Sequence, residues 1–224
     1  MFNFAFTNYP TMEKKYSEKQ EIIMNKALEV FAEKGYDSAS VRDIAHAADV
    51  NVAMISYYFG SKDKLLEEIF KNHTTGMKAK IESIIHSTTH DAFEKVDLLI
   101  DTYIEVIMTN KDFHKLMIRE QVLLKDGPLY DYIRDMKRQN RRLIEIAVKS
   151  GQKAGIFQNN VDISMLATTL IGSVHNFIGN YKYICEEKNL KFIAAGHYDE
   201  KLVDKFRNHL KVMFKAFLTY GISK

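Results

Sequence analysis

Apolar residues recur near the start of the chain at the spacing of an amphipathic helix. The positions, spaced i, i+4, i+7 and i+8 as on one helix face, are Ile23, Ala27, Val30 and Phe31. Ser17 can cap the start of this helix, with Gln20 three positions later completing a capping box. Gly35 supplies a stop signal after the last apolar position. The pattern predicts a first helix between Ser17 and Gly35.

Two short helices and a longer one are predicted next. The first opens at Ser40, whose hydroxyl can accept a hydrogen bond from a nearby backbone amide, and its buried side carries Ile44, Ala45 and Ala48. Residues 49–51 break the pattern, because Asp49 tolerates left-handed backbone and Asn51 can cap a second helix over 52–59. Ser61 caps a further helix with the apolar positions Leu65, Leu66, Ile69 and Phe70. Two short helices around a tight turn predict a helix-turn-helix.

The second short helix presents small and aromatic side chains on its outer side. If Ile55 and Phe59 face the core, the opposite face is free to enter a groove. That face carries Val52, Ala53, Ser56 and part of Tyr57. Tyr57 and Tyr58 offer hydroxyls on stiff arms, and Lys62 adds charge beside a helix N-terminus, a combination suited to binding phosphate.

The last two long helical segments differ in how much of their surface is apolar. The first has one stripe, whereas the second, near the C-terminus, has apolar residues over more than one face. Such a helix needs cover on two sides, so we expect these helices to form a four-helix dimer interface. The expected interface residues are Leu170, Val174, Phe177, Leu210, Phe214 and Phe217. The alternative is a helix at the centre of a monomer core.

Composition favours an all-α protein. The chain has 224 residues, 46% of them hydrophobic, and only 2 prolines and 10 glycines to interrupt helices. No apolar run approaches the roughly 18 residues of a membrane span, and no secretory signal is evident, so we expect a cytoplasmic location. Residues 1–74 hold nine basic and eleven acidic side chains despite a net charge of +3 overall. DNA binding must therefore depend on local geometry instead of bulk charge.

The stretch ALEVFAEKGYDSASVRDIAHAADVNVAMISYYFGSKDKL resembles the N-terminal domain of the TetR family of bacterial transcriptional regulators. The resemblance runs from about Ile23 to Leu65. It implies a homodimeric repressor that binds an inverted-repeat DNA operator and is released by a small-molecule effector. It also implies a DNA-binding domain over 13–74 and a helical effector-binding and dimerisation domain over 75–224. Residues 1–12 are expected to form a loose extension.

The resemblance also implies which residues face DNA. They are Ser40, Arg42, Asn51, Val52, Ala53, Met54, Ser56, Tyr57, Tyr58 and Lys62. Two positions depart from the family pattern: Asp49 replaces a glycine in the turn, and Ser56 stands where tyrosine is common. Asp49 adds negative charge near phosphates and Ser56 removes a donor, so affinity is expected to be modest.

Polar, methionine and aromatic residues on apolar stripes are the candidates for effector binding. They are Tyr103, His114, Met117, Asn140 and His175. Each has an alternative role as an ordinary packed or hydrogen-bonded core residue. No sequence motif defines a pocket in this region.

Other classes of protein find less support in the sequence. Glu82, His86 and His90 have the spacing of metal ligands on a helix, but the segment around residues 87–91 indicates a helix boundary, so no metal site or cofactor is expected. The single cysteine, Cys185, has no partner for a disulfide. No nucleophile elbow, phosphate loop or zinc-protease motif is present, so an enzyme is not expected. The remaining alternative is a helical ligand-binding or interaction protein whose DNA binding has degenerated.

Overall fold

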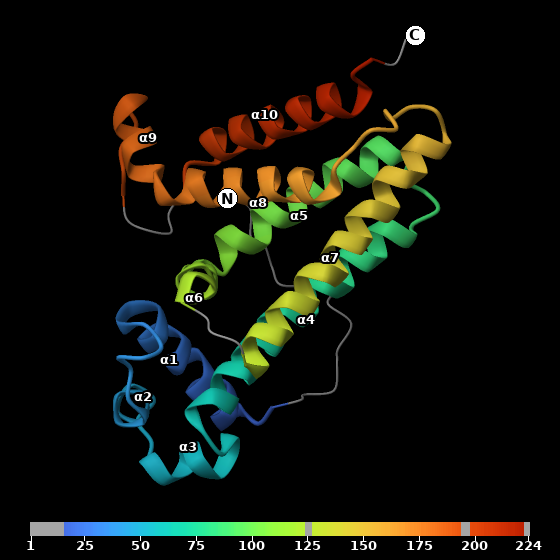
Figure 1. Ribbon diagram of the computed structural model, residues 1–224. Helices are drawn as coiled ribbons and strands as arrows, with labels where there is room; N and C mark the ends of the chain where they lie inside the picture. The colour runs from blue at the N-terminus through green and yellow to red at the C-terminus, as the bar shows by residue number, and fades with distance from the viewer. Residues whose placement is uncertain (1–15, 124–126, 194–197, 222–224) are drawn as a thin grey trace. The chain divides into compact units, whose positions relative to one another are not determined.

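The computed structural model describes residues 16–123, 127–193 and 198–221, and these ranges contain helices and no strand (Figure 1). The helices are α1 (Glu18–Lys34), α2 (Val41–Ala47), α3 (Val52–Phe59), α4 (Lys62–His86), α5 (Ala92–Thr109), α6 (Lys111–Leu123), α7 (Pro128–Lys153), α8 (Ile163–Gly179), α9 (Tyr181–Glu187) and α10 (Glu200–Thr219). The predicted all-α class is confirmed. The expected extension over 1–12 lies outside the described residues.

The chain divides into two compact units. The first comprises the chain to Gly76 together with Asp112–Leu129, and the second comprises Met77–Lys111 and Tyr130–Lys224. Helix α4 therefore contributes residues to both units. In the described part of the chain, no helix is long and apolar enough to cross a membrane.

Local hydrogen bonds set the helix starts of the first unit. Ser17 and Gln20 form the predicted capping box of α1, and Ser40 accepts from the backbone amide of Asp43 at the start of α2. Asn51 Oδ1 accepts from the amide of Ala53, 2.8 Å away, and so begins α3. These caps are interactions between residues two or three apart, which is why the sequence predicts them.

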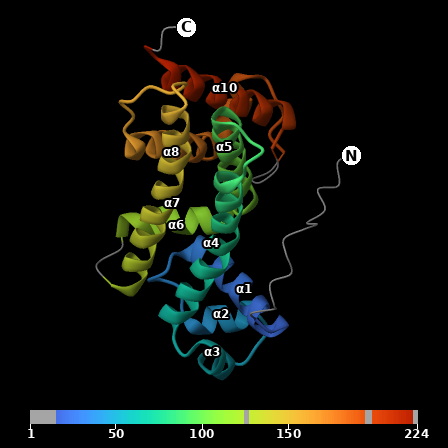
Figure 2. The ribbon, with the colours of Figure 1, turned by 90° about the vertical axis from the view of Figure 1, so that its right-hand side faces the viewer.

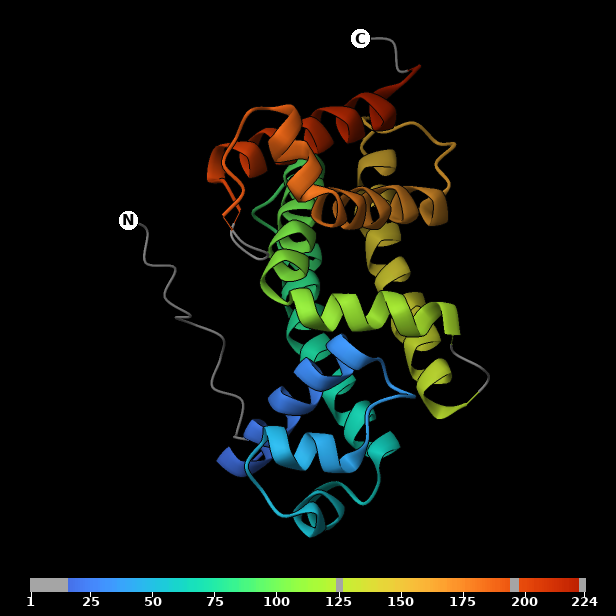
Figure 3. The same cartoon turned by 90° about the vertical axis from the view of Figure 1, so that its left-hand side faces the viewer.

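The core of the first unit forms between α1, the short helices and the start of α4. Its fully buried side chains include Ile23, Phe31, Ile44, Ile55, Leu65 and Phe70. Burial of these apolar surfaces is the main force that holds the short helices in place, because α2 and α3 are too short to be stable alone. Figures 2 and 3 show α3 at the end of this unit opposite α6, with α1 and α2 between them.

Helix α6 packs with the first unit, although the expected domain boundary assigns all of residues 75–224 to the second. The ring of Phe113 lies 5.0 Å from that of Phe70 and stacks 4.8 Å from that of His73. Arg119 Nη2 donates to the carbonyl of Lys34 at the end of α1, at 3.1 Å. These contacts join segments far apart in the sequence, so no local pattern predicts them.

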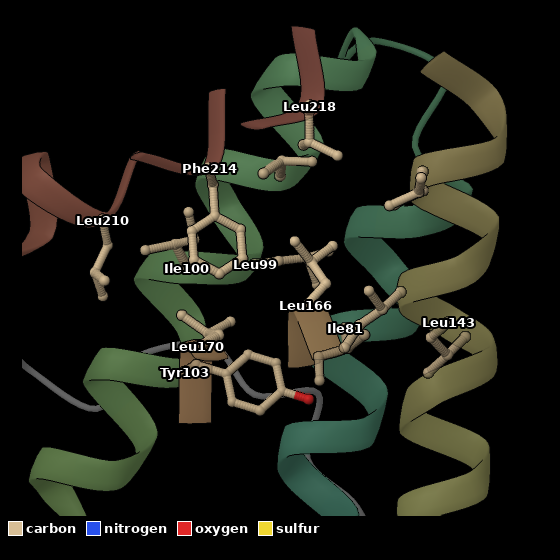
Figure 4. Packing of buried hydrophobic residues seen from close by; sticks show 14 of the residues in the cluster. Ile81, Leu99, Ile100, Tyr103, Leu143, Leu166, Leu170, Leu210, Phe214 and Leu218 are labelled. Atoms are coloured by element: carbon tan, nitrogen blue, oxygen red, sulfur yellow. The ribbon is translucent and has the colours of Figure 1, made fainter. Parts of the chain in front are cut away.

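The second unit has a large apolar core to which α4, α5, α7, α8 and α10 contribute (Figure 4). Helix α5 packs against both α8 and α10. At the edge of this core Asp101 forms ion pairs with Arg207, at 3.1 Å, and with Lys211, at 2.7 Å. A smaller cluster around Phe177, Tyr181 and Cys185 joins the end of α8 to α9 and the start of α10.

Most of the expected dimer residues are covered within the single chain. Leu170, Val174, Phe177, Leu210 and Phe214 are buried there, and only Phe217 is exposed, at 46%. These five side chains lie in the chain's own core, because the apolar stripes of α8 and α10 pack against α5 and its neighbours instead of facing solvent. Contact with a second chain through α8 and α10 stays a prediction. The other faces of α8 and α10 are accessible and carry Met165, Val212 and Phe217.

Candidate nucleic-acid interface

The turn between α2 and α3 has the backbone geometry of a helix-turn-helix. Asp49 takes a left-handed conformation with φ of 51°, which agrees with the expected tolerance of aspartate for this region. The amide of Val50 donates to the carbonyl of Ala45 at 3.0 Å and closes the end of α2. The side chains of Ile55 and Phe59, on one side of α3, are buried, as predicted. Their burial fixes the opposite face of α3 toward solvent.

The predicted DNA-facing residues gather on and around that outward face. Exposed members of the set are Ser40, Arg42, Asn51, Val52, Ala53, Ser56 and Tyr57, and partly buried members are Met54, Tyr58 and Lys62. Lys62 is the first residue of α4, and the others belong to α2, α3 or the residues that cap the starts of these two helices. Small side chains at 53 and 56 leave the backbone of α3 accessible to a groove.

Tyr57 and Tyr58 form an aromatic pair at the end of α3. Their ring centroids are 5.1 Å apart in an edge-to-face arrangement, and the Tyr57 side chain is 83% exposed. Each ring therefore restricts the other while the hydroxyl of Tyr57 remains in solvent. This arrangement fits a hydroxyl that donates to a phosphate oxygen.

Lys62 has a different environment from the one expected of a phosphate-binding lysine. Its Nζ donates to the carbonyls of Tyr36 and Ala39, at 2.8 and 2.9 Å, and lies 4.2 Å from the centroid of the Tyr36 ring. The ammonium thus stabilises the loop between α1 and α2. In this structure its contacts are those of a residue that holds the loop in place.

Electrostatics at the start of α2 are dominated by Asp43. Lys34 Nζ lies 2.6 Å from Asp43 Oδ1, and the amide and hydroxyl of Ser40 both donate to Oδ2, at 2.8 and 2.5 Å. The hydrogen bond from Lys34 and those from Ser40 hold the pKa of the Asp43 carboxyl well below its usual range. The Ser40 hydroxyl is therefore engaged in capping α2.

The expected effector residues do not form one group. His114 and Met117 are buried in the first unit, whereas Tyr103, Asn140 and His175 belong to the second. Tyr103 is buried in the main core, and Asn140 and His175 are partly buried on α7 and α8. Burial lowers the pKa of the His175 imidazole.

Glu82, His86 and His90 also remain apart. Helix α4 ends at His86, and His90 Nδ1 is hydrogen-bonded to the hydroxyl of Ser87, 2.7 Å away. Within the described ranges, no three histidine, cysteine or acidic side chains are placed to hold a metal ion.

Two family models match the chain. One, described as bacterial regulatory proteins, tetR family, matches residues 23–69. The other, described as tetracyclin repressor-like, C-terminal domain, matches residues 89–179. The first covers all of α2 and α3 and the second covers α5 to α8, so a part of each unit is matched.

Curated relatives are transcriptional regulators. The HTH-type transcriptional repressor KstR2 of Mycobacterium tuberculosis is 24% identical over 144 residues, which is 64% of this chain and 72% of that protein. The uncharacterized regulator YvdT of Bacillus subtilis is 35% identical over 101 residues, 45% of this chain and 52% of that protein.

Solved structures share the fold. The ketosteroid transcriptional regulator KstR2 of M. tuberculosis superposes with a TM-score of 0.68 at 19% identity, over 92% of this chain and 97% of that chain. FadR from B. subtilis in complex with stearoyl-CoA gives a TM-score of 0.64 at 21% identity, over 88% and 98% of the two chains.

Proposed function

Since the chain belongs to the TetR family of bacterial regulatory proteins, we propose that it is a homodimeric repressor. The repressor binds a DNA operator, and a small-molecule effector releases it from that operator. It is a ligand-responsive, DNA-binding transcriptional regulator, and its matched relatives are regulators instead of enzymes. The proposal assigns DNA binding to the first unit and effector binding and dimerisation to the second. Its site of action is the cytoplasm, where bacterial DNA lies.

The observation that carries the proposal is the two-sided character of α3. Ile55 and Phe59 anchor one side in the core, and the other side presents Val52, Ala53 and Ser56 to solvent beside an exposed tyrosine. A dimer would place two such helices in successive major grooves about 34 Å apart. Apolar contact with thymine methyls, together with Ser56, Asn51 and Arg42, would read the bases.

Effector release requires different affinities for two conformations. Suppose that a ligand binds the second unit more tightly when the two DNA-binding units of the dimer are wrongly spaced for DNA. Such a ligand must lower the affinity for DNA, by the same coupling free energy with which DNA lowers the affinity for the ligand. Two structural relatives are a regulator named for ketosteroids, KstR2, and FadR, which was solved in complex with stearoyl-CoA. A ketosteroid has an apolar ring skeleton, and stearoyl-CoA has a long apolar acyl chain attached to its charged nucleotide part. This shared feature supports an effector with a large apolar part.

A second candidate is a helical interaction protein that no longer binds DNA. The observation in its favour is the acidic balance of residues 1–74, together with Asp49 in the turn and the engagement of Lys62 by backbone carbonyls. The exposed Tyr57 beside small residues on α3 favours the regulator.

Adding one negative charge to the outer face of α3 separates the two candidates. Ser56→Glu should abolish binding to DNA from upstream of the gene, measured by fluorescence anisotropy, because it places a carboxylate against phosphates. Asn25→Glu adds the same charge on the exposed side of α1 and should leave affinity within about twofold. Equal affinities of the two folded variants would contradict the assignment of α3 as the reading helix.

A further inference from the structure

The loop between α1 and α2 leads directly into the predicted DNA-facing surface. It runs from Gly35 to Ser40, and the Ser40 side chain caps α2. Arg42, which is expected to face DNA, follows two positions later. Because the chain enters α2 through this loop, the position of the loop backbone sets the position of the start of α2.

Two cationic side chains from other helices hold this loop. Lys62, the first residue of α4, donates to the carbonyls of Tyr36 and Ala39. Arg119, on α6, donates through Nη2 to the carbonyl of Lys34, the last residue of α1, at 3.1 Å. Figure 3 shows the end of α1 directly beside α6. Lys62 therefore fixes the later part of the loop, and Arg119 fixes the point at which the chain leaves α1.

The contact between Arg119 and Gly35 is close. Gly35 has φ of 84°, and an added Cβ would lie 2.3, 2.4 and 2.7 Å from Nη2, Cζ and Nε of Arg119. The guanidinium thus occupies the space in which any other residue would carry its side chain. The amide of Gly35 donates to the carbonyl of Phe31, and its carbonyl accepts from the amide of Ala39, at 2.9 and 3.1 Å. Arg119 therefore packs against backbone that is hydrogen-bonded on both sides.

Helix α6 gives Arg119 a fixed base. Leu116 and Phe113 on the same helix are buried, and the Phe113 ring lies 5.0 Å from that of Phe70 on α4. Arg119 follows Leu116 by three residues, so the buried face of α6 holds its backbone although the side chain reaches the surface. A planar guanidinium loses little further conformational freedom for each hydrogen bond that it forms.

Lys34 extends this contact to α2. Its carbonyl accepts from Arg119, and its Nζ lies 2.6 Å from Asp43 Oδ1 in the first turn of α2. We propose that Arg119 is a positioning residue for DNA binding, which acts through Lys34 and Gly35 to fix the start of α2 and thereby the surface of α2 and α3 that reads the operator. This inference rests on the proposed function, since it concerns the same DNA-binding surface.

The inference predicts a selective loss of affinity for the operator. A surface that has the binding geometry for only a fraction of the time binds its specific site more weakly by that fraction. Binding to random DNA depends on charge and does not need that geometry. A positioning residue contacts no phosphate, so its loss leaves the salt dependence of binding unchanged, whereas the loss of a phosphate contact reduces the salt slope by about 1.

Fluorescence anisotropy of the full chain tests this selectivity. Arg119→Gln should weaken binding to DNA from upstream of the gene about tenfold, with affinity for random DNA within about twofold and an unchanged salt slope. Arg119→Lys can still donate to the carbonyl of Lys34 and should bind the operator within about threefold of wild type. Lys115→Gln removes the same charge from an exposed position on α6 and should leave both affinities unchanged.

Three results would overturn the inference. One is an equal loss for both DNAs with a reduced salt slope, which would make Arg119 a phosphate contact. Another is operator affinity within about twofold of wild type for folded Arg119→Gln. Arg119→Met keeps the aliphatic part of the side chain over Gly35 and serves as a second variant. The third result is failure of both variants to fold, which would make the role of Arg119 structural.

Hydrogen exchange without DNA separates this inference from the proposed function. In Arg119→Gln the backbone amides of residues 41–47 should exchange at least about threefold faster than in wild type, and in Lys115→Gln they should not. Equal exchange in wild type and Arg119→Gln would overturn the inference. Failure of the wild type to prefer the upstream DNA would overturn the proposed function alone.

Discussion

At the scale of single residues, Tyr57 and Lys62 show how neighbouring side chains divide two tasks. Tyr57 projects into solvent from the end of α3, and no described contact of its hydroxyl stabilises the fold. Lys62 instead joins the start of α4 to the carbonyls of Tyr36 and Ala39. One is available to DNA, and the other positions the loop that precedes α2.

Opposite effects of substitution should follow at these two positions. Tyr57→Phe should weaken binding to operator and random DNA alike, by about threefold to tenfold, with an unchanged free energy of unfolding. Lys62→Met should lower the free energy of unfolding by about 2 kcal/mol, because two charge-assisted hydrogen bonds are lost. Urea denaturation and anisotropy titrations measure the two quantities.

A folded, fully stable Lys62→Met protein that bound DNA much more weakly than wild type would contradict the division of roles. It would restore Lys62 as a phosphate contact. The direction of this side chain could not be predicted from the sequence, because its carbonyl partners belong to a loop more than twenty residues earlier.

At the scale of elements, the start of α2 depends on the ionised carboxylate of Asp43. The pKa of this carboxyl is depressed in the folded state, so its stabilising effect is fully present above the unfolded value of about 4 and is lost progressively as pH falls from there toward the lower pKa of the folded state. The difference in melting temperature between wild type and Asp43→Asn should therefore be largest near pH 7 and shrink below about pH 4. A difference that stayed constant down to pH 2 would contradict this.

The end of α1 is the second element with a testable constraint. Gly35 has φ of 84°, and an added Cβ would lie 2.3 Å from Arg119 Nη2. Gly35→Ala should cost about 2–4 kcal/mol of unfolding free energy, from backbone strain and from displacement of the Arg119 hydrogen bond. Chemical denaturation measures this cost.

Gly155→Ala is the matched control, because its φ is 71° and no atom lies within 4 Å of the added Cβ. It should cost only about 1 kcal/mol. In an Arg119→Ala background the cost of Gly35→Ala should fall by about 1 kcal/mol. An unchanged cost there would show that Arg119 does not constrain Gly35.

Elements whose boundaries depend on nearby residues could be predicted from the sequence. The caps at Ser17, Ser40 and Asn51 are of this kind, and the buried side of α3 follows from helical periodicity. The packing of α6 could not be predicted, because Phe113 and Arg119 meet partners from α4 and α1 through tertiary contacts alone.

At the scale of the whole molecule, the predicted dimer depends on which faces remain uncovered. The apolar pattern of α10 shows that more than one face is hydrophobic, but the pattern alone does not reveal which face packs against the chain's own core. In the structure Leu210 and Phe214 face inward, while Val212 and Phe217 are exposed at 69% and 46%. These two exposed side chains lie on different sides of α10, and each is a better candidate for contact with a second chain than the buried residues.

Val212→Glu combined with Phe217→Asp should convert dimers to monomers in sedimentation equilibrium, because two charges would be buried at the interface. Operator affinity should fall by more than about a hundredfold, because a monomer binds with one DNA-binding unit instead of two linked ones. Ile22→Glu, at an exposed position on α1, should leave the dimer intact. A double variant that remained dimeric would place the interface elsewhere.

The central claim, that the α2–turn–α3 surface reads an operator, is tested most directly by a binding titration at several salt concentrations. Purified protein would be titrated against DNA from upstream of its own gene, with random DNA as competitor. Saturable binding as a dimer, stronger than the competitor by at least about a thousandfold, is the predicted result. Weak binding of equal strength to both DNAs at every salt concentration would contradict the claim.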